Sequence, residues 1–245
     1  KICKILLVIL AIFLCVAFYE LLGICVAYKK QPEVSNTTKK ETKNGSWNEC
    51  SENTERAVII EKNPEALLQR VRLIKNAKKE IILSTFAFQS DESGKLILGA
   101  LHDAADRGVH IRLLVDGMES WIDMEGNPYF YGLSSHENVE IKLYNKANPL
   151  KPWKMMGRMH DKYLIADGKR YILGGRNTYN YFLGDFPGHK NYDRDVLVVC
   201  DEPEKENSVN QLLEYFETIW EQEDSGYFHD NKKLANRKSV KNAVL

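Results

Sequence analysis

The sequence predicts an α/β domain, a mixed β-sheet flanked by helices, behind an N-terminal transmembrane helix. Three observations support this fold class: a long apolar run at the N-terminus, a strand–helix–strand order in residues 80–116, and an ordinary globular composition. We divide the chain into a transmembrane helix at 1–28, a polar linker at 29–54, an α/β domain at 55–223, and a polar tail or connection to a second half at 224–245.

The N-terminal run is long enough to cross a membrane. Every residue from 5 to 18 is apolar, and the pattern resumes at 21–28 after Tyr19 and Glu20. As a helix this stretch would reach roughly 36 Å, against a hydrocarbon core of about 30 Å. Glu20 is its weakest point, because a carboxylate is costly at mid-bilayer and less so near an interface. A cleaved signal peptide is the alternative, but no A-x-A cleavage site follows, so we favour a membrane anchor.

The charges beside this helix suggest an orientation. Lysines on the C-terminal flank outnumber those on the N-terminal flank: Lys29, Lys30, Lys39, Lys40 and Lys43 against Lys1 and Lys4. The positive-inside rule therefore predicts a single-pass protein of the cell membrane with a cytoplasmic domain. Residues 29–54 are polar and almost free of aliphatic side chains, which is typical of a linker.

The first half of the domain has the order of a βαβ unit. Asn63 and Pro64 predict a helix start, and apolar residues follow at helical spacing. Residues 80–88 read as a buried strand, 93–107 as a helix ending before Gly108, and 109–116 as another strand. This order predicts parallel pairing of the two strands.

The second half is richer in strands. We expect strands at 138–145, 160–166, 170–175 and 194–200, and an amphipathic helix at 210–222. Asp167 and Gly168 form a strong turn dipeptide, so the second and third of these strands should form a hairpin. The domain should therefore contain six or seven strands.

The hairpin carries the residues of greatest chemical interest. Side chains two apart on a strand share a face, so His160 and Lys162 should project together, with Leu164 continuing the row. Asp161 and Tyr163 should point to the other face. A nucleophile and a fixed cation would then lie on one side of the strand.

Together with their neighbours, these groups suit a phosphodiester substrate. A neutral imidazole is a competent nucleophile, and an ammonium can neutralise phosphoryl oxygens as charge develops. We expect the Asp167 carboxylate to orient the imidazole and Asn177 to donate to a phosphate oxygen. Gly174 and Gly175 should let a backbone N–H approach an anion.

These residues match a known signature. The pattern H-x-K-x4-D-x6-G-G-x-N is met at His160, Lys162, Asp167, Gly174, Gly175 and Asn177. Six fixed positions recur by chance about once in 10⁷ or more windows. The pattern resembles the HKD motif of the phospholipase D superfamily, and residues 56–222 are similar to bacterial cardiolipin synthases.

The resemblance implies a two-step reaction on a phospholipid substrate at the membrane. His160 would attack phosphorus to form a phosphohistidine, Lys162 and Asn177 would hold the phosphoryl group, and Asp167 would support them. Water or an alcohol would then resolve the intermediate, giving hydrolysis or phosphatidyl transfer. The resemblance implies no metal and no cofactor.

The family site requires two such motifs, and a second is missing from these residues. The histidines at 102, 110, 136, 189 and 229 all lack a lysine two positions later, so we expect structural roles for them. The second motif is expected either beyond Leu245 in a longer chain, which we favour, or in a second identical chain. Either way, the fragment alone should be inactive.

Two other functions are open. One is a nuclease of the same superfamily. The 34 basic residues are balanced by 34 acidic ones, so the chain lacks the excess positive charge of a general nucleic-acid binder. We therefore do not favour nucleic acid as a partner. The other is an inactive membrane scaffold.

Three further segments are candidates for supporting roles. Asp116 either caps a turn or belongs to a site at the strand end. The basic and apolar segment 146–160 either guides anionic headgroups and enters the membrane interface, or is a solvated, partly packed loop. Residues 185–195 are a candidate wall of the site.

Overall fold

The computed structural model describes residues 2–29, 35–36, 39–40, 55–154, 156–202, 207–228, 238, 240 and 242. These residues form two units. The first combines the N-terminal segment with residues 147–157, and the second contains residues 54–146 and 158–245. The expected linker and the final tail lie largely outside the described residues.

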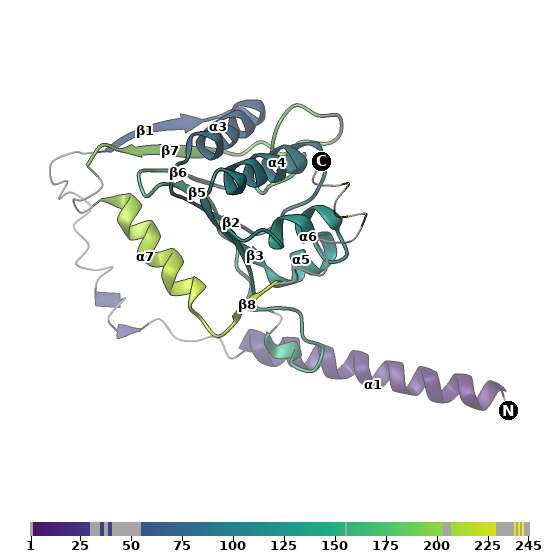
Figure 1. Ribbon diagram of the computed structural model, residues 1–245. Helices are drawn as coiled ribbons and strands as arrows, with labels where there is room; N and C mark the ends of the chain where they lie inside the picture. Colours follow the sequence, from purple (N-terminus) through teal and green to yellow (C-terminus); the bar gives the residue numbers. More distant parts are fainter. Residues whose placement is uncertain are drawn as a thin grey trace. The chain divides into compact units, whose positions relative to one another are not determined.

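The first unit is built on one long helix. Helix α1 (Ile2–Lys29) is apolar enough over Ile2–Ala27 to cross a membrane by length and composition. Its side chains are exposed over most of its length, as Phe13 at 67% illustrates. A short 3₁₀ helix, η1 (Pro152–Lys154), packs on α1 within this unit (Figure 1).

The described part of the second unit contains one mixed sheet. Its strands are β1 (Glu55–Ile60), β2 (Glu80–Thr85), β3 (His110–Asp116), β4 (Val139–Tyr144), β5 (Lys162–Ala166), β6 (Arg170–Gly174), β7 (Asp195–Cys200) and β8 (Ser225–Tyr227). They lie in the order β1-β7-β6-β5-β2-β3-β4-β8. Strands β2, β3 and β4 are parallel to one another, and every other neighbouring pair is antiparallel.

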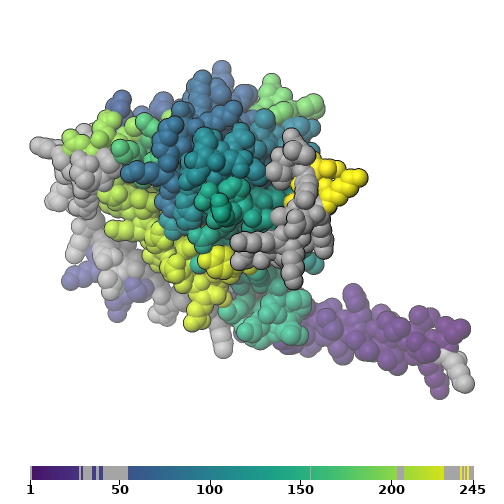
Figure 2. Space-filling model, in the orientation of Figure 1, coloured from purple at the N-terminus to yellow at the C-terminus, as the bar shows by residue number. Residues whose placement is uncertain are grey.

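Helices cover both faces of the sheet. They are α3 (Asn63–Asn76), α4 (Glu92–Asp106), α5 (Gly117–Asp123), α6 (Pro128–Ser134) and α7 (Ser208–Trp220). Buried side chains of α3, α4 and α6 join the larger apolar core, whereas those of α7 join a second core on the other face (Figure 1). In Figure 2 the blue and teal surface of α3, α4 and α6 closes over the first of these faces.

The side chains of β5 point alternately to the two faces of the sheet, so the strand contributes to both cores. Leu164 packs in the larger core, whereas Tyr163 and Ile165 pack in the core under α7. Successive side chains of a strand point to opposite faces, and both faces of this strand are covered by helices. The predicted alternation is therefore confirmed, and the predicted mixed α/β fold with it.

Most predicted elements form close to their expected bounds. The βαβ unit is present as β2, α4 and β3, with parallel pairing of the two strands. Gly108 follows α4 at a φ of 84°, and the hairpin turn places Asp167 and Gly168 at positive φ values of 55° and 62°. Helix α3 begins at Asn63 as predicted, but the Asn63 side chain does not cap it; its oxygen accepts a hydrogen bond from Arg176.

Four elements in the described part of the second unit were not predicted. Strand β1 and helices α5 and α6 are short, and strand β8 lies beyond the expected domain boundary at residue 223. Strand β8 belongs to the domain because Gly226 pairs with Leu143 of β4. The described sheet therefore has eight strands rather than six or seven.

Candidate active site

Three of the predicted site residues, His160, Lys162 and Asn177, lie near the point where β5 begins. Strand β5 lies between β2 and β6, and it starts only at Lys162. Beyond that point the extensions of β2 and β6 pair directly, through a bridge between Phe88 and Thr178. The Thr178 amide donates to Ala87 O at 3.0 Å. This pairing brings Asn177, which follows the glycine pair, to the side of the sheet where β5 begins.

His160 and Lys162 meet at the ring of Phe86. The imidazole contacts this ring edge to face, with the centroids 4.6 Å apart, and the Lys162 ammonium lies 5.3 Å from the ring centroid. The predicted common side of the two residues is therefore confirmed. Sequence reasoning placed Phe86 only in a buried strand; its position directly after β2, at the carboxyl end of the parallel strands, was the available signal.

The two side chains differ in their exposure. His160 is exposed, whereas Lys162 is only 5% exposed. The Lys162 ammonium donates a hydrogen bond to the His160 carbonyl at 2.6 Å. The exposed imidazole of His160 can contact an incoming anion, while the hydrogen bond to the His160 carbonyl keeps the Lys162 ammonium in place. This is the arrangement that attack on a phosphoryl group needs.

The electrostatic surroundings favour a neutral imidazole. Desolvation lowers the pKa of His160, and the nearby Lys162 cation lowers it further. Desolvation also lowers the pKa of Lys162 to about 8, with Asp161 and Asp193 acting in the opposite direction. At neutral pH the imidazole is therefore free to act as a nucleophile, while most of the lysine remains cationic.

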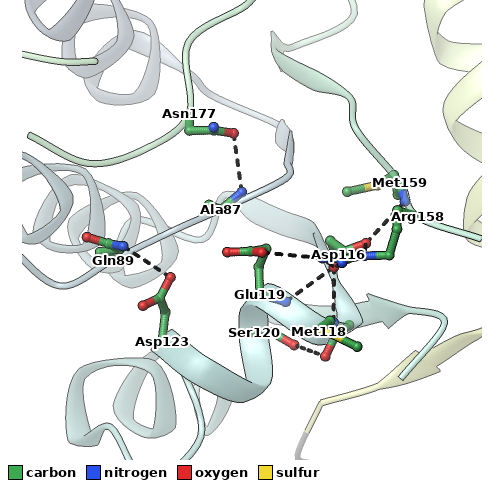
Figure 3. A network of polar contacts seen from close by, with 11 residues as sticks. Ala87, Gln89, Asp116, Met118, Glu119, Ser120, Asp123, Arg158, Met159 and Asn177 are labelled. Atoms are coloured by element: carbon green, nitrogen blue, oxygen red, sulfur yellow. Dashed lines mark hydrogen bonds and ion pairs between the residues drawn. The ribbon is translucent and has the colours of Figure 1, made fainter. Parts of the chain in front are cut away.

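Asn177 is fixed with its donor group available. Its Oδ1 accepts a hydrogen bond from the Ala87 amide at 3.3 Å, and the residue is 6% exposed (Figure 3). This bond assigns the carbonyl oxygen to the backbone side, so the Nδ2 group remains the donor for another partner. Donation from this group to a phosphate oxygen stays a prediction.

Asp116 holds the segment that leads into His160. Its buried carboxylate caps α5 by accepting from the amides of Met118 and Glu119. The same carboxylate accepts two bonds from Arg158 Nε at 2.9 Å and one from the Met159 amide at 3.1 Å (Figure 3). Asp116 therefore serves both as the predicted cap and as a positioning residue for the candidate nucleophile.

Arg158 adds a second fixed cation beside the ring. Its guanidinium carbon lies 5.1 Å from the centroid of Phe86, and one of its nitrogens is 3.3 Å from a carboxylate oxygen of Glu119. Three positively charged or nucleophilic side chains thus surround one aromatic ring. Sequence reasoning had counted Arg158 only among the cations of the preceding loop.

Asp167 is not brought to the imidazole, which corrects its expected orienting role. The residue lies at the opposite end of β5, in the hairpin turn. Its carboxylate accepts bonds from the backbone amides of Lys78, Lys79 and Glu80 at 2.7–3.1 Å. Those amides occupy the carboxylate, so Asp167 ties the hairpin to the start of β2 and supports the site from a distance.

The glycine pair also has a role different from the expected one. A Cβ on Gly175 would lie 1.9 Å from Oδ2 of Asp193, and a Cβ on Gly174 would lie 2.0 Å from Oδ1 of Asp195. Two acidic side chains therefore already occupy the space that was assigned to an anion. The glycines are required for this packing, and the segment containing Asp193 borders the site as predicted.

A buried ion-pair network lies behind the glycines. Asp195 is 2.8 Å from Arg70 and 3.2 Å from Arg176, and all three side chains are buried. Arg176 also donates to the carbonyls of Ile60 and Glu61. The network joins α3, β1, β6 and β7, so it fixes the backbone from which Asn177 projects.

Three of the other described histidines are paired with carboxylates, whereas His189 packs on the ring of Tyr181, with the centroids 5.4 Å apart. His102 and His136 both contact Asp106, at 3.2 and 3.1 Å, and His110 contacts Glu140 at 3.0 Å. His229 lies outside the described residues, and among those described no group of His, Cys, Asp and Glu has metal-site geometry.

Comparison with known proteins agrees with this geometry. Residues 70–220 match the family model described as cardiolipin synthase, PLD-like domain. Cardiolipin synthase C of Escherichia coli is 29% identical over 171 residues, covering 64% of this chain and 34% of that protein. Cardiolipin synthase 1 of Staphylococcus aureus is 34% identical over 117 residues, covering 47% of this chain and 23% of that protein.

Solved structures show the same fold. Phosphatidylserine synthase of Haemophilus influenzae has a TM-score of 0.59 at 18% identity, covering 86% of this chain and 46% of that one. The phospholipase D family member Nuc of Salmonella typhimurium has a TM-score of 0.53 at 18% identity, covering 71% of this chain and 99% of that one.

The chain spans about a third or less of the curated relatives it matches. The family model nevertheless covers more than half of the chain, and the matched segment contains every residue of the motif. The chain therefore belongs to the phospholipase D superfamily, in the family of cardiolipin synthase PLD-like domains.

Proposed function

We propose that this chain supplies one half of a phospholipid phosphodiesterase or phosphatidyltransferase site, with His160 as its nucleophile. The observation that carries the proposal is the placement of an exposed imidazole and a buried ammonium on one aromatic ring. The family and its cardiolipin synthase relatives support phospholipid chemistry. The apolar helix α1 supports a site that works at a membrane.

The reaction has two displacements at phosphorus. In the first, a neutral imidazole nitrogen of His160 forms a bond to phosphorus, and the bond to the leaving alcohol breaks. Lys162 and the Asn177 amide stabilise the phosphoryl oxygens as their negative charge grows. In the second, water or a lipid hydroxyl attacks phosphorus, its proton passes to the group that protonated the leaving alkoxide, and the bond to the imidazole breaks.

The leaving alkoxide needs a proton, and this half of the site has no second histidine of the same pattern. His160 is the one histidine in the sequence that is followed two residues later by lysine. We propose that a second half supplies the acid, either from a longer chain or from a second copy of this chain.

The direct test is covalent trapping. The chain, in lipid nanodiscs and together with its second half, is mixed with radiolabelled phosphatidylglycerol, quenched in alkali and analysed by mass spectrometry. We expect a peptide in which His160 carries the phosphatidyl group, seen after alkali as its deacylated glycerophosphoryl remnant, and the loss of this adduct in His160→Ala. The matched control is His102→Ala, which changes a partly buried, carboxylate-paired histidine outside the site.

Two outcomes would replace the proposal. An adduct that forms with a nucleic-acid phosphodiester and not with lipid would assign the chain to nuclease chemistry. Undiminished lipid turnover in His160→Ala would remove the imidazole from the mechanism. The molar mass of the detergent-solubilised chain then separates a site shared by two copies from one completed within a longer chain.

A further inference from the structure

The loop at residues 147–157 is docked on the apolar helix. The Tyr19 hydroxyl donates a hydrogen bond to the Leu150 carbonyl at 3.0 Å. Further along the helix, a Cβ on Gly23 would lie 2.5 Å from Cγ of Pro152, and both residues are buried. A glycine therefore allows the loop to approach the helix closely, as small residues do where segments pack in membranes.

The outer surface of the same loop is apolar and basic. Leu150 is 79% exposed, Trp153 45% and Met156 49%, while Lys151 and Lys154 are also exposed. Single exposed apolar residues are common, but three within one short loop are a patch. Tryptophan, aliphatic side chains and lysines in one segment are typical of elements that lie at the boundary between lipid and water.

The docking position also explains the polar break in the helix. Tyr19 and Glu20 interrupt the apolar run at the level where the loop packs. Residues 2–18 would extend about 26 Å as a helix, close to the hydrocarbon thickness of roughly 30 Å. A boundary at Tyr19 and Glu20 would place the carboxylate near water, where its cost is small.

We propose that residues 147–157 form a membrane-interface loop, which docks on α1 at Tyr19 and Gly23 and inserts Leu150, Trp153 and Met156 into the bilayer surface. The occupant of this patch is phospholipid, because the patch continues the exposed apolar surface of α1. The proposal rests on α1 as a membrane anchor, a part of the proposed function.

This loop would connect the bilayer directly to the candidate nucleophile. Only Arg158 and Met159 separate it from His160 in the sequence, and both are held by the carboxylate of Asp116. The segment proposed to bind the lipid surface would thus end shortly before His160, the residue proposed to attack the lipid. The lysines of the loop would face the phosphate level of the bilayer.

Tryptophan quenching tests the insertion. The full chain is placed in nanodiscs that contain lipids with a nitroxide either high on the acyl chain or near its methyl end. We expect the shallow label to quench more strongly, and Trp153→Phe to remove about half or more of that quenching. The matched control is Trp121→Phe, which removes an exposed tryptophan of α5 and should have little effect.

A second pair of variants tests the docking. Gly23→Val would force Pro152 away from the helix, so shallow quenching of Trp153 should fall at least twofold. Ala11→Val, at an exposed position of α1, should leave it unchanged. Resistance of each variant to carbonate extraction shows separately whether α1 anchors the chain.

The proposal is overturned if Trp153→Phe leaves shallow quenching unchanged in a chain that resists extraction. It is also overturned if Trp121→Phe removes as much quenching, or if Gly23→Val and Ala11→Val behave alike. Extraction of the wild-type chain by carbonate would instead refute the membrane anchor itself. Failure of the loop and failure of the anchor are thus distinguishable.

Discussion

Replacing Asp167 should cost stability rather than chemistry. Its carboxylate accepts from the backbone amides of Lys78, Lys79 and Glu80, and its own φ is 55°. In Asp167→Ala the three amides lose their acceptor, although water can replace it at Lys78 and Lys79. Alanine also adopts the left-handed conformation at a cost of about 1 kcal/mol or more. We expect a loss of about 2–4 kcal/mol in the free energy of unfolding.

Asp167→Asn provides the matched comparison. Asparagine tolerates the left-handed conformation and keeps one acceptor oxygen, so the loss should be about 1 kcal/mol or less. Both variants are measured by urea unfolding in detergent, followed by tryptophan fluorescence. Lipid turnover per folded molecule is measured on the chain combined with its second half. Turnover should be unchanged within about twofold in both variants. A loss of 100-fold or more in lipid turnover, with an unchanged free energy of unfolding, would refute the reasoning and indicate that Asp167 takes part in the reaction.

Three further predictions concern the site and its support. The value of kcat/KM should rise with pH through the lowered pKa of His160, because the imidazole must be neutral to attack. It should fall again near pH 8, where Lys162 loses its proton. A pH profile without this fall on the alkaline side would contradict the prediction. Asp195→Asn leaves two buried arginines without their carboxylate and should lower the free energy of unfolding by about 3–5 kcal/mol in urea denaturation. Gly175→Ala should cost about 1–3 kcal/mol, and a double-mutant cycle with Asp193→Ala should recover most of it, because the new Cβ meets that side chain.

Local sequence was sufficient for the elements with strong repeating patterns. The βαβ unit, the hairpin at Asp167–Gly168 and the helix after residue 208 follow from hydrophobic periodicity and turn chemistry, which act over a few residues. The short β1, α5, α6 and β8 carry too few periodic positions to be recognised. Strand β8 exists because β4 offers an open edge, which is a property of the folded sheet.

The motif by itself determined the chemical class and the pair His160 and Lys162, because two residues spaced by one on a strand share a face wherever the strand lies. Only the tertiary structure decided the partners of the remaining motif residues. Asp167 is separated from the imidazole by the length of β5, and Gly175 is covered by Asp193. The ring of Phe86 and the carboxylate of Asp116 reach the site from distant parts of the chain, through the pairing of strands that no local pattern specifies.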